Sequence, residues 1–140
     1  MKKSTDNLWN EMLESDNVDE FIKNNPEEFF FNGLEEFFDY QLKVKKLKSG
    51  KVFEAAMLER HFGHQIITGT RGATRDKIIQ LCFGLKLNLK EAQQFIKISG
   101  NRELYLRDPR DAVIIFAIKD GKSLMDVNIE LEKRGFKLFE

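Results

Sequence analysis

Cysteine, proline and long apolar runs are scarce in this 140-residue sequence, and each scarcity excludes a class of protein. The single cysteine, Cys82, excludes an internal disulfide and suits a reducing compartment. Only Pro26 and Pro109 are prolines, which excludes a proline-rich linker. The longest apolar run, 112–118, is too short to cross a bilayer, and no apolar segment follows the basic first residues. We therefore expect a cytoplasmic protein with no membrane span and no secretory signal.

Charge is plentiful but unevenly distributed. Residues 1–40 hold eleven acidic residues and three lysines, a formal charge of −8, so residues 41–140 carry +8. Residues 41–80 alone hold nine basic and three acidic residues. This pattern favours binding of a polyanion, with the acidic head masking the basic section. Attraction between the two sections inside the folded domain explains the pattern equally well, and both interpretations stay open.

The apolar spacing predicts an all-α protein. From residue 49 onward, capping residues mark the expected helix starts, and glycines mark several of the ends. The expected starts are Ser49, Glu59, Thr74, Asn88, Asp108-Pro109 and Ser123. The run "AVIIFAI" at 112–118 is apolar on every side, so we expect its helix to form the buried centre. Further helices are expected earlier, one beginning at Pro26 and one at about 34–45.

A shift of 35 residues superposes two predicted helical hairpins without a gap. The shift brings together similar residues and the caps Asn88 and Ser123. The matching pairs are Asp76 and Asp111, Ile79 and Ile114, Leu89 and Leu124, Glu91 and Asp126, and Gly100 and Gly135. Two stacked hairpins with the same capping logic are indicated. Duplication stays open, because short helical hairpins share such signals.

The stretch 61–77, "HFGHQIITGTRGATRDK", concentrates the polar chemistry. It lacks the closing Gly-Lys-Ser/Thr of a nucleotide-binding loop, and no strand precedes it. His61 and His64 share a helix face, but a metal needs a third ligand, and Cys82 belongs to an apolar helix. No triad surrounds Cys82. We therefore expect no catalytic residue, no metal and no cofactor, and predict that the chain is not an enzyme.

Between Ser49 and Thr74 the spacing resembles the helix-turn-helix of phage-repressor/Cro-like (XRE-type) DNA-binding domains. The features that carry the resemblance are Val52, Leu58, Ile66, Gly69, basic Arg71 and the capped helix at Thr74. The wider stretch also looks like small bacterial proteins that add a C-terminal helical pair with an "RDPRDA" segment and an acidic leader. The resemblance implies a helical arm at 1–33, a helix-turn-helix domain at 34–100 and a hairpin at 101–140, forming one compact unit overall.

The resemblance implies a transcriptional regulator that binds double-stranded DNA. The second helix of the motif would enter the major groove and expose Glu59, Arg60, His61, His64, Gln65 and Thr68. Of these, Gln65 and Arg60 are the expected base readers. The expected phosphate contacts are Arg71, Arg75 and Lys77, with Gly69 and Gly72 letting the backbone approach closely.

Three residues depart from the family pattern. Met57 stands where the family has glycine, so the turn is expected to differ, and Phe53 replaces a small alanine at the helix crossing. Glu59 would be repelled by phosphate. These departures favour the alternative function, a protein-interaction or adaptor module on a helix-turn-helix scaffold that no longer binds DNA.

Thirteen phenylalanines are expected mostly in the core. One ring from 29–31, or Phe37 or Phe38, is a candidate contact for a partner protein or a homodimer. An N-terminal arm tucked across the domain is the interpretation that we prefer. In 101–112, Arg110 and Asp111 are interpreted as a salt-bridged helix cap with Asp108.

Overall fold

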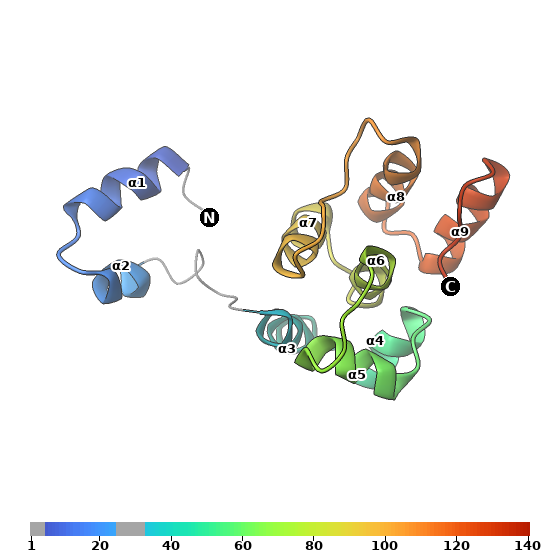
Figure 1. Cartoon of the computed structure of the whole chain (residues 1–140), viewed down its shortest axis with the longest axis horizontal. Coiled ribbons are helices and arrows are strands. Elements are labelled where there is room, and N and C mark those ends of the chain that lie inside the picture. The colour runs from blue at the N-terminus through green and yellow to red at the C-terminus, as the bar shows by residue number, and fades with distance from the viewer. Residues whose placement is uncertain (1–4, 25–32) are drawn as a thin grey trace. The chain divides into compact units, whose positions relative to one another are not determined.

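The computed structural model describes residues 5–24 and 33–140, and within these ranges it contains helices and no strand (Figure 1). The expected all-α class is therefore confirmed for the described residues. The chain divides into two units, Met1–Asn32 and Gly33–Glu140. The helix expected at Pro26 and the phenylalanines at 29–31 lie outside the described residues.

The first unit contains two helices, α1 (Thr5–Glu14) and α2 (Val18–Asn24), which pack against each other. The side chain of Asn17 starts α2, because its Oδ1 accepts a hydrogen bond from the backbone N–H of Glu20 at 2.8 Å. Trp9 and Leu13 of α1 are exposed. In the described part of the chain, every helix is too short or too polar to span a bilayer.

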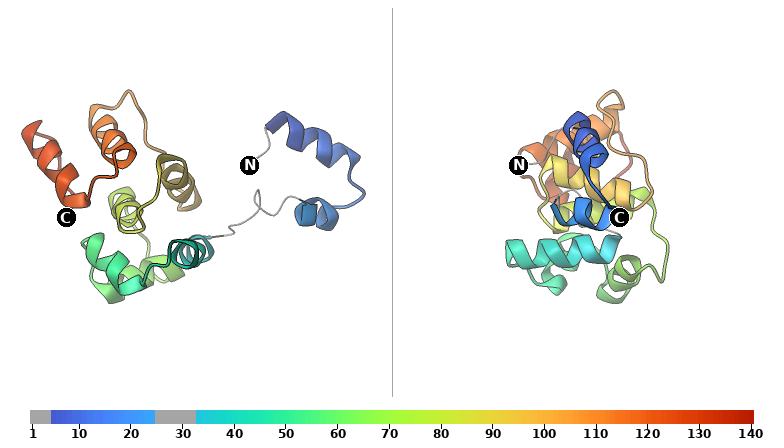
Figure 2. Two further views of the ribbon diagram at one scale, coloured as in Figure 1. Left: turned by 180° about the vertical axis from the view of Figure 1, so that it is seen from behind. Right: turned by 90° about the vertical axis from the view of Figure 1, so that its left-hand side faces the viewer.

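The second unit contains the remaining described helices. They are α3 (Leu34–Lys45), α4 (Ser49–Ala55), α5 (Arg60–Thr68), α6 (Arg75–Gly84), α7 (Leu89–Ile98), α8 (Pro109–Lys119) and α9 (Leu124–Lys133). Residues 101–140, expected as a hairpin packed on 34–100, belong to the same unit as those residues. Within this unit α6 lies between α4–α5 and α8–α9 (Figures 1 and 2).

Side-chain caps begin most of these helices at the expected places. Thr74 accepts a hydrogen bond from the N–H of Lys77, and Asp108 accepts from two N–H groups at the start of α8. Asn88 and Ser123 each form a capping box. The prediction for Ser49 was wrong, because α4 begins at Ser49 itself and the preceding Lys48 makes no side-chain cap.

The buried centre is α6, so the expectation that 112–118 would be the centre was wrong. Every α6 residue from Ile78 to Gly84 is buried. The reason is packing, because α6 contacts α4, α7 and α9. The described neighbours with which α8 packs closely are only α7 and α9, and Phe116 is left 55% exposed.

Phe37 and Phe38 belong to the core and do not face a partner. They are 0% and 2% exposed, respectively. The ring of Phe37 packs on Phe95 with centroids 5.0 Å apart, and the ring of Phe38 stacks on Phe53 at 5.5 Å. Both rings therefore fix α3 against its neighbours.

One buried amide connects distant parts of the second unit. Gln80 of α6 is fully buried, and its Nε2 donates to the carbonyl of Ala56 at 2.9 Å and to that of Glu140 at 2.8 Å. Ala56 lies at the end of α4, and Glu140 lies in the segment after α9 that has no regular secondary structure. The amide thus joins the α4–α5 turn to residues 136–140 through α6.

The two hairpins α6–α7 and α8–α9 repeat one set of contacts 35 residues apart. The side-chain amide of Gln93 exchanges two hydrogen bonds with the backbone of Leu104, and Asn128 exchanges the same two with Phe139. Gln93 and Asn128 occupy equivalent positions in α7 and α9. The repeat suggested by the sequence therefore extends to tertiary contacts.

Candidate nucleic-acid interface

The turn between α4 and α5 contains one residue in the left-handed backbone conformation. Met57 has a φ of 59°, although glycine is the residue that this conformation favours. Hydrogen bonds close the turn, because the N–H of Met57 donates to Glu54 and that of Leu58 donates to Phe53 at 2.9 Å. Leu58 is buried. Met57 therefore adopts the left-handed conformation that is unfavourable for a methionine.

At the crossing of α4 and α5, α4 contributes a large residue, Phe53, and α5 contributes glycine, Gly63. The Phe53 ring is 1% exposed and lies over Gly63, where an added methyl group would overlap it. The edge of the His64 ring also meets Phe53, with centroids 4.9 Å apart. A large residue on α4 is thus accommodated by the missing side chain on α5, and the two helices still cross closely.

Glu59 caps α5. Its two carboxylate oxygens accept hydrogen bonds from the backbone N–H groups of His61 and Phe62, each at 2.9 Å. These bonds lower the pKa of Glu59. The carboxylate is therefore oriented toward the helix start, which gives an acidic residue at this position a structural role.

One side of α5 presents a polar stripe to solvent, while Gly63, Ile66 and Ile67 bury the opposite side. The exposed members of the stripe are Arg60, His61, His64 and Thr68, and Gln65 is half-buried beside them. Thr68 donates its hydroxyl to the carbonyl of His64 at 2.9 Å. Five of the sequence-predicted DNA contacts therefore lie on one helix face.

Arg60 and Arg71 lie against neighbouring groups at the two ends of α5. The guanidinium of Arg60 lies so close to Gly50, in the first turn of α4, that an added methyl group there would overlap it. The guanidinium of Arg71 lies 5.2 Å from the centroid of the Phe62 ring. Gly69 ends α5 with a φ of 81°, and the N–H of Arg71 then donates to Gln65.

Arg75 and Lys77 are directed elsewhere. The guanidinium of Arg75 makes a bidentate pair with Asp111 at 3.0 and 2.7 Å and also donates to the carbonyls of Arg102 and Glu103. The ammonium of Lys77 donates to the carbonyl of Glu140. The structure therefore does not bring these two cations to the α5 stripe.

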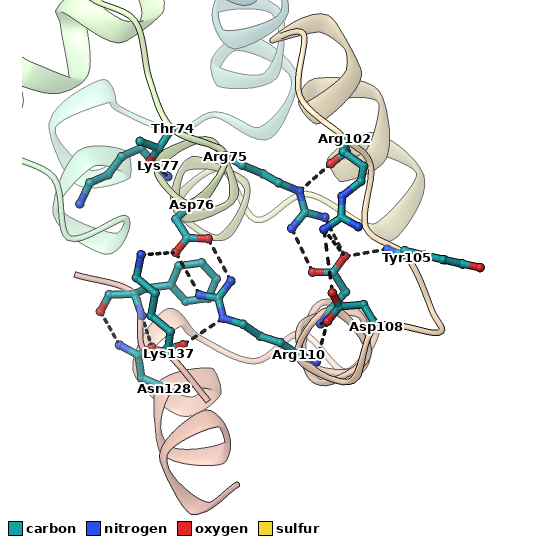
Figure 3. A network of polar contacts seen from close by, with 12 residues as sticks. Thr74, Arg75, Asp76, Lys77, Arg102, Tyr105, Asp108, Arg110, Asn128 and Lys137 are labelled. Atoms are coloured by element: carbon teal, nitrogen blue, oxygen red, sulfur yellow. Dashed lines mark hydrogen bonds and ion pairs between the residues drawn. The ribbon is translucent and has the colours of Figure 1, made fainter. Parts of the chain in front are cut away.

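A reciprocal pair of ion pairs ties α6 to α8 (Figure 3). Arg75 binds Asp111, and Arg110 binds Asp76 through two bonds of 3.0 Å. Arg75 also donates from Nε to the carbonyl of Arg102, and Arg110 donates from Nε to that of Lys137, at equivalent positions of the repeat. Arg110 and Asp111 thus form ion pairs as expected, but with α6 and not with Asp108, which caps α8.

The carboxylate of Asp111 is almost fully buried at 2% side-chain exposure. Burial raises its pKa, but the hydrogen bonds from Arg75 and from the N–H of Tyr105 outweigh burial and hold that pKa below its ordinary value. Sequence reasoning missed this pair. The usable signal was the Arg-Asp dipeptide that recurs in register at 75–76 and 110–111.

The histidines and the cysteine form no reactive cluster in the described residues. No group of three or more His, Cys, Asp or Glu side chains there is arranged to hold a metal ion. Cys82 is buried in α6, and burial raises the pKa of its thiol. A thiol in such surroundings stays protonated at neutral pH, so Cys82 acts as a small core residue.

Comparison with known proteins found no matching family model, no matching curated protein and no matching solved structure.

Proposed function

We propose that this chain is a DNA-binding transcriptional regulator of the phage-repressor/Cro-like type, with its helix-turn-helix at residues 49–69. The observation that carries the proposal is the polar stripe on α5, from Arg60 to Thr68, which projects from a helix whose other side is buried. A helix of this kind, preceded by a tight turn and a short helix, fits the major groove of B-DNA.

The helix order of the second unit supports the same proposal. The pair α4–α5 follows the longer helix α3 and is followed by α6 and α7, as the family resemblance implies. The left-handed turn at Met57 and the close crossing at Phe53 and Gly63 are compatible with such a motif. Met57 and Phe53 are therefore weaker arguments for loss of DNA binding than the sequence alone suggested.

The contact roles follow from the positions of the side chains. His64, Gln65 and Thr68 lie on the polar side of α5, which would face the major groove in this docking mode, so we assign them to base edges. Arg60 lies against the start of α4, so we assign it to phosphate instead of base reading. Arg71 is the second phosphate contact. Arg75 and Lys77 are left out, because their charged groups bind other parts of the protein.

The charge distribution is compatible with this role. Residues 33–140 carry a formal charge of +5 and residues 1–32 carry −5. Exposed lysines lie before and within the first turn of α4, among them Lys46, Lys48 and Lys51. Positive charge beside the stripe attracts the phosphate backbone, and the acidic first unit is suited to modulate access to DNA.

Fluorescence anisotropy with a labelled random duplex at low salt tests the proposal. We expect binding that weakens steeply as salt rises, because each phosphate contact releases counterions. The double variant Arg60→Ala/Arg71→Ala should bind more weakly and flatten the slope of log K against log salt by about two units.

The control is the double variant Lys97→Ala/Arg107→Ala, which removes two exposed cations away from α5. Its slope should stay at the wild-type value. Absence of binding at low salt, or equal loss in both double variants, would contradict DNA recognition through α5. Urea unfolding of each variant separates loss of contacts from loss of fold.

The alternative, an interaction module on this scaffold, is supported by a different observation. Phe116 and Ile129 expose apolar surface on α8 and α9, away from α5. Protein binding at that surface is compatible with DNA binding at α5, because different helices carry the two faces.

A further inference from the structure

Lysines gather where the end of α3 meets the turn between α6 and α7. Residues 43–51 and 82–90 together hold seven lysines and no acidic residue. The two stretches are in contact, because the ammonium of Lys45 donates to the backbone carbonyl of Lys86 at 2.9 Å. Three exposed residues at this contact form no ion pair within the described residues, and we call them the lysine surface: Lys46, Lys86 and Lys90.

The acidic side chains next to these stretches are already paired. Glu91 accepts from the ammonium of Lys45 at 2.9 Å and from the backbone N–H of Asn88 at 3.0 Å. The carboxylate of Glu54 lies 3.7 Å from the ammonium of Lys51. The lysine surface therefore keeps a positive charge that neighbouring carboxylates leave unpaired, and this charge is available to an anion.

The three lysines occupy positions that local structure does not favour. Lys46 ends α3 and Lys86 lies in the turn after α6, each with a φ of 55°. This left-handed conformation is unfavourable for a residue with a side chain. Lys90 lies in the first turn of α7, where the helix dipole favours negative charge. Helix and turn formation alone therefore does not explain lysine at these positions.

The internal repeat shows that the hairpin fold does not require two of these lysines. Gly121 and Met125 occupy the positions in the second hairpin that correspond to Lys86 and Lys90. Gly121 has a φ of 68°, so the equivalent turn is made there by the residue that this conformation favours. The first hairpin instead carries a charged side chain on a strained backbone. Such strain is typical of positions where the side chain contacts a ligand.

The lysine surface adjoins the polar stripe of α5 through the start of α4. Gly50 follows Lys46 closely in the chain and lies in the first turn of α4, against the guanidinium of Arg60. Lys48 is exposed between them. Cations therefore follow one another from the start of α5, past the start of α4, to the start of α7.

We propose that Lys46, Lys86 and Lys90 bind phosphates of duplex DNA beside the base pairs that α5 contacts. The inference rests on the proposed DNA binding by α5 and extends the contact to the α6–α7 turn. Lysine binds phosphate as a compact charge and does not read bases, so the lysine surface adds affinity and no sequence preference. A bound phosphate also offsets the unfavourable charge of Lys90 at a helix start.

Fluorescence anisotropy of the full chain with the labelled random duplex over a salt series tests the inference. Lys46→Gly/Lys86→Gly should bind more weakly and flatten the slope of log K against log salt by about two units, because two phosphate contacts are lost. The same substitutions should raise the urea midpoint of unfolding, since glycine fits the left-handed backbone. A variant that is more stable but binds more weakly has lost contacts and not its fold.

Met57→Gly is the matched control, because it places glycine at the other described non-glycine residue with positive φ and removes no charge. Its slope should stay at the wild-type value. Lys46→Arg/Lys86→Arg keeps both charges and should also keep the slope. A wild-type slope in Lys46→Gly/Lys86→Gly, or equal flattening in Met57→Gly, would overturn the inference.

Arg60→Ala/Arg71→Ala separates this inference from the proposed function. Flattening of the slope in both double variants supports both contacts. Flattening in the arginine variant alone retains recognition through α5 and overturns the lysine surface. Flattening in the glycine variant alone retains the lysine surface and contradicts the α5 contact. Absence of wild-type binding at low salt overturns both proposals.

Discussion

At the residue scale, Met57 adopts a left-handed backbone conformation, which is unfavourable for residues other than glycine. A φ near 59° costs a non-glycine residue about 1–2 kcal/mol. The sequence suggested that methionine would change the turn. The conformation persists because Leu58 is buried and its N–H is bonded to Phe53. The contacts of Leu58 therefore outweigh the backbone preference of methionine, and they cannot be predicted from position 57 alone.

Met57→Gly should therefore stabilise the protein by roughly 1 kcal/mol, because glycine relieves the strain and little packing is lost from an exposed side chain. Urea unfolding would measure the change. The matched control is Met125→Gly, an exposed methionine inside α9, which should lose roughly 0.5–1 kcal/mol. Destabilisation by both substitutions would show that the turn carries no strain.

At the element scale, helix starts were more predictable than helix burial. Capping is local, so Thr74, Asn88, Asp108 and Ser123 could be identified from neighbouring residues alone. Burial depends on which other helices pack against an element, and the apolar run at 112–118 could not reveal that the other helices of 33–140 leave Phe116 exposed. The exposed stripe of α5 was predictable because its apolar and polar residues segregate at helical spacing.

At the crossing of α4 and α5, the effect of Gly63→Ala on the free energy of unfolding should change sign with the residue at position 53. Gly63→Ala should destabilise the wild type by about 1–3 kcal/mol, because the new methyl group meets the Phe53 ring. In a Phe53→Ala background, itself about 3–5 kcal/mol less stable, Gly63→Ala should be stabilising, since the space is open and alanine favours helix.

A double-mutant cycle measured by urea unfolding would give the coupling energy, with at least about 1 kcal/mol expected. Gly63→Ala that destabilises both backgrounds to the same extent would mean that the two residues do not pack as described. Anisotropy on the same variants would report whether the crossing also positions α5 on DNA.

At the scale of the second unit, the reciprocal Arg-Asp pairs hold the two hairpins together. Asp111 is paired at both carboxylate oxygens and is almost fully buried. The sequence aligned Asp76 with Asp111 but could not show that each would bind the arginine of the other hairpin. Pairing across hairpins depends on how the two hairpins pack. The prediction that 108–111 form a cap among themselves therefore accounted for the hydrogen bonds of Asp108 but not for the ion pairs to α6.

Asp111→Asn should lower the free energy of unfolding by about 2–3 kcal/mol at pH 7, because it weakens charged hydrogen bonds in a buried site. The folded-state pKa of Asp111 lies below its ordinary value of about 3.9. Its stabilisation is therefore complete above that value and disappears as pH falls through the folded-state pKa. The difference between wild type and variant should accordingly narrow below about pH 4.

Urea unfolding over a pH series would check this behaviour. Asp120→Asn is the control, since its pair with Lys119 is exposed and worth less than about 1 kcal/mol. A wild-type–variant difference that stays constant into acid would mean that the carboxylate charge of Asp111 is not the stabilising feature.

The buried amide of Gln80 has a mechanical consequence. One rigid group holds both the end of α4, next to the turn that orients α5, and the segment 136–140 beside α9. A displacement of that segment must either break a buried hydrogen bond or pull on the α4 terminus. We therefore expect a shift of the segment after α9 to change the position of the α4 terminus, and with it the orientation of α5.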